Sequence, residues 1–347
     1  MLRNNEVVTE ILVIIVNYRT ASLAEACLEA IARERAAGTS LTAILVDGCS
    51  GDGSVAQLSS FLDRTGMGSW VELLPLDING GFGWANNQAI QHRADCLPPY
   101  IYLVNPDARV KPGAISALAH TLGLHGNVAA VGSQLIDADD ARTASAFSFP
   151  SIASEFVRGA HTSAFEKILG LNPVVIDRED AGEVDWVTGA SVMLRTEALV
   201  SAGLFDDGFF LYFEEVELMH RLKRRGYKIW FEPRSRVHHI GGAATGVDQP
   251  NIRRARPNYW FQSRQRFFAL TGGRAYGFMA NLAWLFGHFL IGIPRRLLSS
   301  SFRLRAQPGE LRGLLDTGLW PQGTATTPAA AVISGEPSQK PFWIEQA

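Results

Sequence analysis

The chain has 347 residues, of which 19% are charged and 47% hydrophobic, and its net charge is −2. A chain of this length and composition buries a large core, which excludes a disordered or fibrous protein. The three cysteines, Cys27, Cys49 and Cys96, follow no metal-binding spacing and predict neither a disulfide framework nor a zinc ribbon. The first ten residues lack the apolar run of a secretory signal, so we expect a cytoplasmic protein.

The charge is distributed unevenly along the chain. The segment from His220 to Arg312 holds 18 Lys or Arg and three acids, whereas the remainder holds 14 basic and 31 acidic residues. A basic C-terminal third on an acidic body favours an anionic partner, such as phosphate, a membrane surface or a nucleic acid. Ordinary solvated surface charge would give the same count.

Apolar runs alternate with helical segments through the first half of the chain. Continuous apolar runs predict strands buried on both faces at 11–16, 43–47, 70–76, 101–105 and 128–133. A helical stretch at 21–37 and further helices separate these strands. This alternation predicts an α/β fold with a parallel sheet covered on both faces. Ligands bind such sheets at the carboxyl ends of the strands.

The second half of the chain gives a mixed pattern. The sequence VDWVTGASVMLR at 184–195 predicts a strand leading into a helix, and 214–226 predicts a helix ended by glycine. The runs KIWFEP and RVHHIGG predict two short strands, while 137–182 allows no firm assignment. The Pro-, Gly- and Ser-rich stretch from about residue 320 has the composition of a disordered tail.

Polar side chains follow the predicted strands and are expected to line one edge of the sheet. Asp47 ends a strand, where a carboxylate can accept from a nucleobase N–H or from ribose hydroxyls. Asp107 follows another strand, where it can hold Mg²⁺ or Mn²⁺ beside a diphosphate, although a turn aspartate next to Pro106 is equally compatible. The loop NGGFGWANN at 79–87 is a weak match to a dinucleotide-binding fingerprint.

The stretch FDDGFFLYFEEVELMHR at 205–221 combines acidic and aromatic side chains that could take part in catalysis. Glu214, Glu215 and Glu217 crowd a helix start directly after an aromatic cluster. Acids at a helix N-terminus are ordinary partners of the helix dipole, but aromatic residues beside a carboxylate also form a sugar platform next to a general base. Downstream, VHHIGG supplies His239, which could complete a metal site with an upstream acid.

Seven segments, taken together and in order, resemble the family 2 inverting glycosyltransferases, specifically the rhamnosyltransferase-like branch. The segments lie between residues 10 and 245 and are VNYRT, VDGCSGDGS, NGGFGWANN, NPDARV, VTGASVMLR, FDDGFFLYFEEVEL and EPRSRVHHIGG. The resemblance implies a GT-A type fold, a doubly wound mixed sheet with a C-terminal helical extension. It places the transferase domain at 1–245, a basic apolar helical extension at 246–312 and a tail at 313–347.

The resemblance also implies roles for individual residues. Glu215 is the expected general base, with Glu214 as the alternative, and Asp107 and His239 are the expected metal ligands for Mg²⁺ or Mn²⁺. The expected donor-binding residues are Asn17, Asp47, Asn79, Gly81, Asn87 and Arg221. The expected residues of the sugar and acceptor region are Trp186, Gly189 and Ala190.

Two features depart from the family pattern. The metal motif reads Asn105-Pro-Asp107 in place of two acids, which weakens the inference of tight metal binding. Glu215 and Glu217 stand where aspartate is more usual, and the extra methylene moves the carboxylate by about 1.5 Å. The helix is therefore expected to lie slightly further back, or the base is a neighbouring residue.

The implied function is transfer of a sugar, with rhamnose as a candidate, from a nucleoside-diphosphate donor with inversion. The expected acceptor is a glycan or a polyprenyl-diphosphate-linked lipid in cell-surface polysaccharide synthesis, and no nucleic acid is expected as a partner. A nucleotide-dependent oxidoreductase would need a glycine fingerprint after ILVIIV, and VNYRTAS contains none. A basic nucleic-acid-binding module would leave the acids and aromatics of 205–217 unexplained.

The segment 275–293 is apolar and carries no formal charge. Four polar residues recur at intervals of seven and share one helical face, namely Arg274, Asn281, His288 and Arg295. Apolar residues form another face, namely Phe278, Leu282, Leu285 and Phe289. This pattern predicts a helix lying in the membrane interface, and so a peripheral protein at the inner face of the plasma membrane. A helix packed on the catalytic domain, or a dimer contact, is the alternative.

Overall fold

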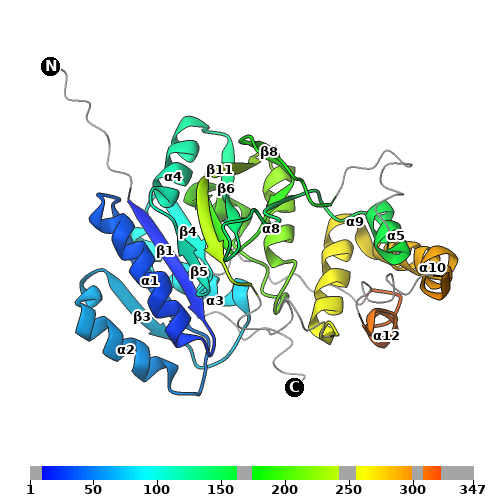
Figure 1. The fold of residues 1–347 in the computed structure, drawn as a ribbon, viewed down its shortest axis with the longest axis horizontal. Helices are drawn as coiled ribbons and strands as arrows, with labels where there is room; N and C mark the ends of the chain where they lie inside the picture. The colour runs from blue at the N-terminus through cyan, green and yellow to red at the C-terminus, as the bar shows by residue number, and fades with distance from the viewer. Residues whose placement is uncertain (1–9, 162–173, 242–254, 299–307, 322–347) are drawn as a thin grey trace.

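A nine-stranded mixed sheet forms the centre of the protein, with helices on both of its faces (Figure 1). The structure, a computed structural model, describes residues 10–161, 174–241, 255–298 and 308–321. The strands follow the order β3-β2-β1-β4-β10-β6-β11-β5, and β8 pairs with β11. A second, two-stranded sheet joins β7 and β9.

The strands are β1 (Ile11–Asn17), β2 (Leu41–Asp47), β3 (Val71–Pro75), β4 (Tyr100–Val104), β5 (Ala108–Val110), β6 (Val128–Ile136), β7 (Ala146–Phe147), β8 (Gly182–Val184), β9 (Trp186–Val187), β10 (Ser191–Arg195) and β11 (Lys228–His239). The α-helices are α1 (Ala21–Ala36), α2 (Ser54–Thr65), α3 (Phe82–His92), α4 (Ala114–Leu124), α5 (Ile152–Ala160), α7 (Thr196–Ala202), α8 (Glu214–Arg224), α9 (Asn258–Gly287), α10 (Ile293–Leu298) and α12 (Glu310–Asp316). Short 3₁₀ turns lie at Met67–Ser69 and Ala94–Cys96, and a π-helix, η3, lies at His288–Gly292.

The sheet has a parallel half and a mixed half. Strand β1 pairs in parallel with β2 and β4, and β2 pairs in parallel with β3. Strand β10 is antiparallel to both β4 and β6 and so joins the halves. Strand β11 runs parallel to β6 and antiparallel to β5. The expected doubly wound mixed sheet is therefore confirmed.

Two apolar layers hold the helices on the sheet. Helices α1, α2 and α4 bury residues such as Leu28, Phe61 and Leu118 against one face. Helices α3, α7 and α8 bury residues such as Ile90 and Leu222 against the other. Strand β1 contributes to both layers because its side chains alternate between the faces, which explains the continuous apolar run in its sequence.

One expectation about the strands was wrong. The runs KIWFEP and RVHHIGG do not form two strands, because β11 continues from Lys228 to His239. Its register against β6 shifts between Glu232 and Arg236, where the chain contains Pro233. A bulge at this point accommodates a proline within a strand that pairs on both sides.

The C-terminal helices form a unit beside the sheet, together with α5 (Figure 1). Helix α9 is kinked at Gly273, which has a φ of 86°. By length and composition, the stretch Asn258–Arg295 is the one helix of the described residues that could cross a membrane. The expected tail at 313–347 begins too early, because α12 continues to Asp316, and its part beyond residue 321 lies outside the described residues.

The polar stripe of the C-terminal segment does not face outward as a membrane-interface helix would require. Asn281 and His288 are buried, and Asn281 accepts a hydrogen bond from Arg264 Nη1 at 2.6 Å. His288 stacks on the buried Trp284 with ring centroids 4.7 Å apart. Asn281 and His288 therefore point into the protein, whereas Arg274 and Arg295 are exposed, so the four residues do not form one outward-facing stripe.

Candidate functional site

The ends of β1 and β2 carry a hydrogen-bonded pair, Asn17 and Asp47. The two residues are register partners, and Asn17 Nδ2 donates to Asp47 Oδ2 at 2.8 Å. Ser50 donates its hydroxyl to the same oxygen at 2.7 Å and its backbone N–H to Asp47 Oδ1 at 2.9 Å. Because both side chains are buried, these bonds fix the Asp47 carboxylate in one orientation at the strand end.

The loop of Asn79 and Gly81 lies next to this pair. Asn79 Oδ1 accepts the backbone N–H of Gly81 at 3.1 Å and lies 3.9 Å from where a Cβ on Gly48 would stand. Gly81 has a φ of 85°, and a Cβ on it would lie 1.8 Å from the carbonyl oxygen of Phe210. Only glycine therefore lets this loop lie against the backbone that leads to α8.

Asn87 and Arg221 lie among other protein groups. Asn87 Nδ2 donates to the Phe205 carbonyl at 2.9 Å and to Asp207 Oδ1 at 2.7 Å, and Asn87 Oδ1 accepts the Phe205 N–H. Arg221 donates to Glu217 and to the Ala202 carbonyl. These contacts give both residues a structural role, and direct contact with a donor stays a prediction.

The last strand of the sheet brings His239 against Asp107. Strand β11 pairs His239 with Ala108, and the distance from His239 Nε2 to Asp107 Oδ1 is 3.2 Å. Asn105 Nδ2 lies 3.4 Å from the same ring nitrogen. The sequence analysis predicted that Asp107 and His239 act together, and the antiparallel pairing of β5 with β11 makes the two side chains neighbours.

The donor set of this pair fits a divalent cation that is bound together with a substrate. A carboxylate oxygen and an imidazole nitrogen both suit Mn²⁺, and the carboxylate suits Mg²⁺. Within the described ranges, no group of three or more His, Cys, Asp or Glu side chains is arranged to hold a metal. Asp107 and His239 would therefore supply part of the coordination sphere, and diphosphate oxygens and water would supply the rest.

Glu214 and Glu215 form an acidic pair at the start of α8. Glu214 is buried and Glu215 half-buried, and a buried Oε2 atom of each lacks a hydrogen-bond partner. Burial raises the pKa of both carboxyls, and the neighbouring charge of Glu215 raises the pKa of Glu214 further. Backbone N–H groups, including that of Gly189, partly oppose the rise for Glu215. Unpartnered buried carboxylates with raised pKa are typical of proton-transfer sites.

Gly189 and Ala190 connect the acidic pair with the metal segment. A Cβ on Gly189 would lie 3.8 Å from Glu215 Cβ and 3.4 Å from the ring of Phe82. The carbonyl of Ala190 accepts the backbone N–H of Asn105 at 3.0 Å. The glycine leaves space directly beside Glu215, and this space adjoins the loop that carries Asp107.

Trp186 lies on β9 with one ring face covered. Its ring stacks on Phe147 at a centroid distance of 4.1 Å, and its Nε1 donates to the Ser148 carbonyl at 3.0 Å. The contacts account for its position within the small sheet, and contact with a bound sugar stays a prediction.

The loop 206–213 has an unusual backbone conformation and contacts with α9 that the sequence analysis missed. Tyr212 and Phe213 both have φ near +70°, at 69° and 68°, which is unusual for bulky residues. Ser263 on α9 donates to the Leu211 carbonyl at 3.0 Å, and Tyr259 stacks on Tyr212. The signal was the presence of Ser263 and Arg266, two polar residues that contact this loop, in a largely apolar helix.

The mixed sheet, the strand-end polar cluster and the acidic helix start define a GT-A type glycosyltransferase. Solved structures with this fold include "GalNAc-T7 with UDP, GalNAc and Mn2+", at TM-score 0.55 and 14% identity, covering 88% of this chain and 59% of that one. Another is "Mannosyltransferase PcManGT from Pyrobaculum calidifontis in complex with GDP-Man and Mn2+", at TM-score 0.54 and 14% identity, covering 90% and 88%.

The chain belongs to the family described as "Glycosyltransferase like family 2", whose sequence model matches residues 9–272. It is 28% identical over 192 residues to N-acetylglucosaminyl-diphospho-decaprenol L-rhamnosyltransferase of Mycobacterium tuberculosis, covering 51% of this chain and 61% of that protein. It is 27% identical over 163 residues to Rhamnosyltransferase WbbL of Escherichia coli (strain K12), covering 44% and 58%. The chain thus matches about three fifths of the length of these relatives.

Proposed function

We propose that the protein is an inverting glycosyltransferase that moves rhamnose from a nucleoside-diphosphate donor to a hydroxyl of a lipid-linked glycan. The observation that carries the proposal is the position of Glu215, half-buried beside Gly189, with an unpartnered oxygen and a pKa raised by burial. The matching rhamnosyltransferases, one of which is named for a decaprenol-linked acceptor, support the sugar and the acceptor class.

Glu215 acts as the general base in this proposal. An acceptor hydroxyl is too weakly acidic to ionise at neutral pH, so the Glu215 carboxylate takes its proton as the oxygen attacks the anomeric carbon. The bond to the diphosphate breaks on the opposite face of the sugar, and the configuration inverts. Glu214 is the more buried of the two acids, so it stays protonated more readily and leaves the negative charge on Glu215.

The donor lies along the strand ends in this proposal. Asn17 and Asn79 lie beside Asp47, whose fixed carboxylate accepts hydrogen bonds from the nucleobase or the ribose. Asp107 and His239 would hold Mg²⁺ or Mn²⁺, which neutralises charge on the departing diphosphate. The Ala190 carbonyl holds Asn105, so the sugar region and this segment keep a fixed separation.

The reaction takes place at the inner surface of the plasma membrane in this proposal. A polyprenyl-diphosphate-linked acceptor has its reactive sugar near lipid headgroups, and the C-terminal third of the chain is basic and partly apolar. We also propose 1–245 as the transferase domain and 246–312 as the helical extension.

A donor-hydrolysis screen tests the proposed function without knowledge of the acceptor. The purified protein is incubated with a panel of nucleoside-diphosphate sugars and Mg²⁺ or Mn²⁺, and release of the nucleoside diphosphate is followed. We expect slow hydrolysis of one donor class and its loss in Asp107→Ala. Absence of both hydrolysis and binding for every donor would contradict the transferase function, and preference for a donor other than a rhamnose nucleotide would contradict the sugar.

A further inference from the structure

The second half of helix α9 packs one face closely on α5. A Cβ on Gly159 would lie 2.1 Å from the carbonyl oxygen of Trp284, and one on Gly287 would lie 2.1 Å from that of Phe156. The two helices therefore approach through their backbones. The polar side chain of Asn281 lies on this inward face and is buried. The side chains of the inward face are therefore in contact with other residues of the protein.

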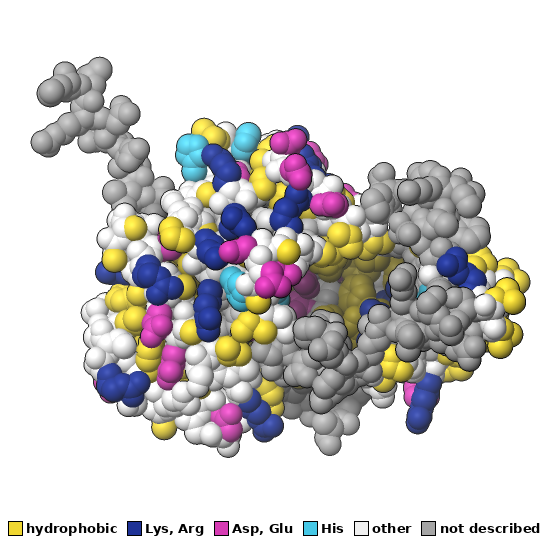
Figure 2. Space-filling view, in the orientation of Figure 1, with side chains coloured by type: hydrophobic (Ala, Val, Ile, Leu, Met, Phe, Trp, Pro, Cys, Tyr) yellow, Lys and Arg dark blue, Asp and Glu magenta, His cyan; other side chains and the backbone are white. Residues whose placement is uncertain are grey.

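The opposite face is apolar and exposed. It consists of residues from the end of α9, from η3 and from α10, which we call the apolar face: Phe286, Phe289, Leu290, Leu297 and Leu298. Their exposed fractions are 58%, 52%, 66%, 76% and 87%. Figure 2 shows hydrophobic side chains, in yellow, at the end of the molecule where Figure 1 labels α10. Contiguous exposed apolar residues of this size mark interaction surfaces.

Two arginines accompany the apolar face: Arg295 lies on α10 between Leu290 and Leu297, and Arg274 lies on α9 before Phe286. No charged residue lies between Arg274 and Arg295, and both are exposed. From 246 to 312 the sequence contains 11 Arg and no Lys, against the acids Asp248 and Glu310. An apolar surface that carries cationic side chains complements a bilayer whose headgroups are anionic.

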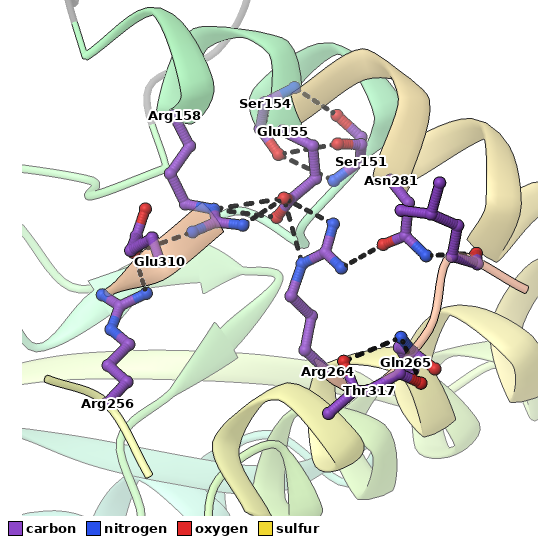
Figure 3. A network of polar contacts seen from close by, with 11 residues as sticks. Ser151, Ser154, Glu155, Arg158, Arg256, Arg264, Gln265, Asn281, Glu310 and Thr317 are labelled. Carbon is purple, nitrogen blue, oxygen red and sulfur yellow. Dashed lines mark hydrogen bonds and ion pairs between the residues drawn. The ribbon is translucent and has the colours of Figure 1, made fainter. Parts of the chain in front are cut away.

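The buried charges that join α9 to α5 and α12 favour a position on the bilayer over insertion across it. Glu155 Oε2 accepts from Arg158 at 2.7 Å and from Arg264 at 2.6 Å (Figure 3). Glu310 Oε1 accepts from Arg158 at 3.0 Å and from Arg256 at 2.9 Å. Helices α5, α9 and α12 share this network, so a spanning α9 would break it or carry it into hydrocarbon.

We propose that the apolar face docks into the headgroup region of an anionic phospholipid bilayer, with the exposed Arg295 of α10 against lipid phosphates. The inference rests on the proposed work at a membrane surface and identifies the side of the molecule that meets lipid. A second copy of the chain is the less suitable occupant, because a two-fold contact through this face would bring the α10 arginines of both copies together.

Vesicle sedimentation with the full-length protein tests this inference. The vesicles contain phosphatidylcholine alone or with phosphatidylglycerol, and no donor or acceptor is added. The test variant is Leu297→Ser with Leu298→Ser, since both side chains are largely exposed and their loss leaves the packing on α5 intact. The matched control is Leu124→Ser on α4, where the leucine is 65% exposed on the sheet domain.

We expect wild type and Leu124→Ser to bind the anionic vesicles, with weaker binding at high salt. The double variant should bind roughly ten- to hundred-fold more weakly, because it loses two apolar side chains that the bilayer would otherwise bury. Equal binding by the double variant, or no binding by wild type, would overturn the inference. A wild-type dimer in sedimentation velocity that the double variant dissociates would assign the face to a second copy.

Donor hydrolysis in the same samples separates this inference from the proposed function. The double variant should hydrolyse the donor as wild type does, because the apolar face is remote from Glu215 along the chain and in the fold (Figure 1). Vesicle binding without any donor hydrolysis would leave the docking surface standing and contradict the transferase function alone.

Discussion

Arg266 on helix α9 and Asp206 form a buried ion pair across 60 residues of sequence, with Nη2 at 2.7 and 2.9 Å from the two carboxylate oxygens. The guanidinium also lies against Gly208, where a Cβ would stand 2.1 Å from Cζ. The loop held in this way continues through Tyr212 and Phe213 into Glu214. Helix α9 therefore positions the acidic pair at the start of α8.

Arg266→Met is expected to lower turnover more than donor affinity. The change leaves Asp206 buried without its cation, which destabilises a protein by about 3–5 kcal/mol. The loop loses its fixed position, so kcat should fall while KM for the donor changes little. Thermal unfolding and steady-state kinetics check both effects. Arg312→Met, which removes an exposed ion pair with Asp316, is the control and should change neither. A turnover equal to wild type would show that the pair has no positioning role.

Glu215→Gln is expected to lower transfer by about two to four orders of magnitude, the usual contribution of a general base. Donor affinity should stay within a few-fold, since the substitution keeps the size of the side chain. Glu214→Gln is the matched control and should be much milder, because adjacent residues on a helix point about 100° apart. The opposite ranking would assign the base to Glu214. Because burial raises the pKa of Glu215, the acidic limb of the kcat/KM profile should lie above the ordinary glutamate pKa.

Asp107→Ala is expected to abolish metal-dependent donor binding. The carboxylate is the anionic member of the pair with His239, so its loss leaves one neutral ligand. Calorimetric titration with a nucleoside diphosphate, with and without Mn²⁺, measures the effect, and EDTA treatment of wild type should reproduce it. Donor affinity that is the same with and without EDTA in wild type would exclude the metal role.

Glu155→Gln is expected to destabilise the C-terminal helices at neutral pH. Burial raises the pKa of Glu155, but Arg158 and Arg264 outweigh this effect and hold it at about 2. The stability from its ionisation is therefore complete above the ordinary glutamate pKa and is lost as the pH falls toward 2. We expect the variant to lose about 3–5 kcal/mol at pH 7, because Arg264 stays buried without its partner.

Urea unfolding at several pH values measures this difference. The difference between wild type and Glu155→Gln should shrink as the pH falls below the ordinary glutamate pKa, because the unfolded chain then binds a proton that folded Glu155, with a pKa of about 2, does not yet bind. Asp316→Asn removes an exposed partner and should show no such trend. A difference that is constant across this range would mean that Glu155 stabilises the unit through packing and not through its charge.

The sheet and its ligand edge could be predicted from the sequence because buried strands show as apolar runs. The strands at 11–16 and 101–105, and the polar residues that follow them, are where the pattern placed them. Asp107 and His239 could not be paired from spacing, because their contact depends on the register between β5 and β11. The family resemblance supplied that link.

The orientation of the C-terminal helix could not be predicted for a physical reason. A period of seven shows that Asn281 and His288 share a face but not whether that face meets water or protein. Their packing partner is α5, within the stretch 137–182 that gave no firm pattern. Arg264, which satisfies Asn281, comes from the other side of the kink at Gly273. The contacts that decide the orientation of this helix therefore join segments that are distant in the sequence.

The position of β11 in the sheet sets the order in which the site can form during synthesis. Strands β1 to β4 pair among themselves, so the Asn17–Asp47 edge can assemble on a nascent chain that has reached Val104. Asp107 meets His239 only after β11 has emerged and inserted between β6 and β5. Contacts of such long sequence separation form slowly. A chain that stops before His239 thus lacks the contact between Asp107 and His239, and β11, the last strand in the sequence, completes the proposed site.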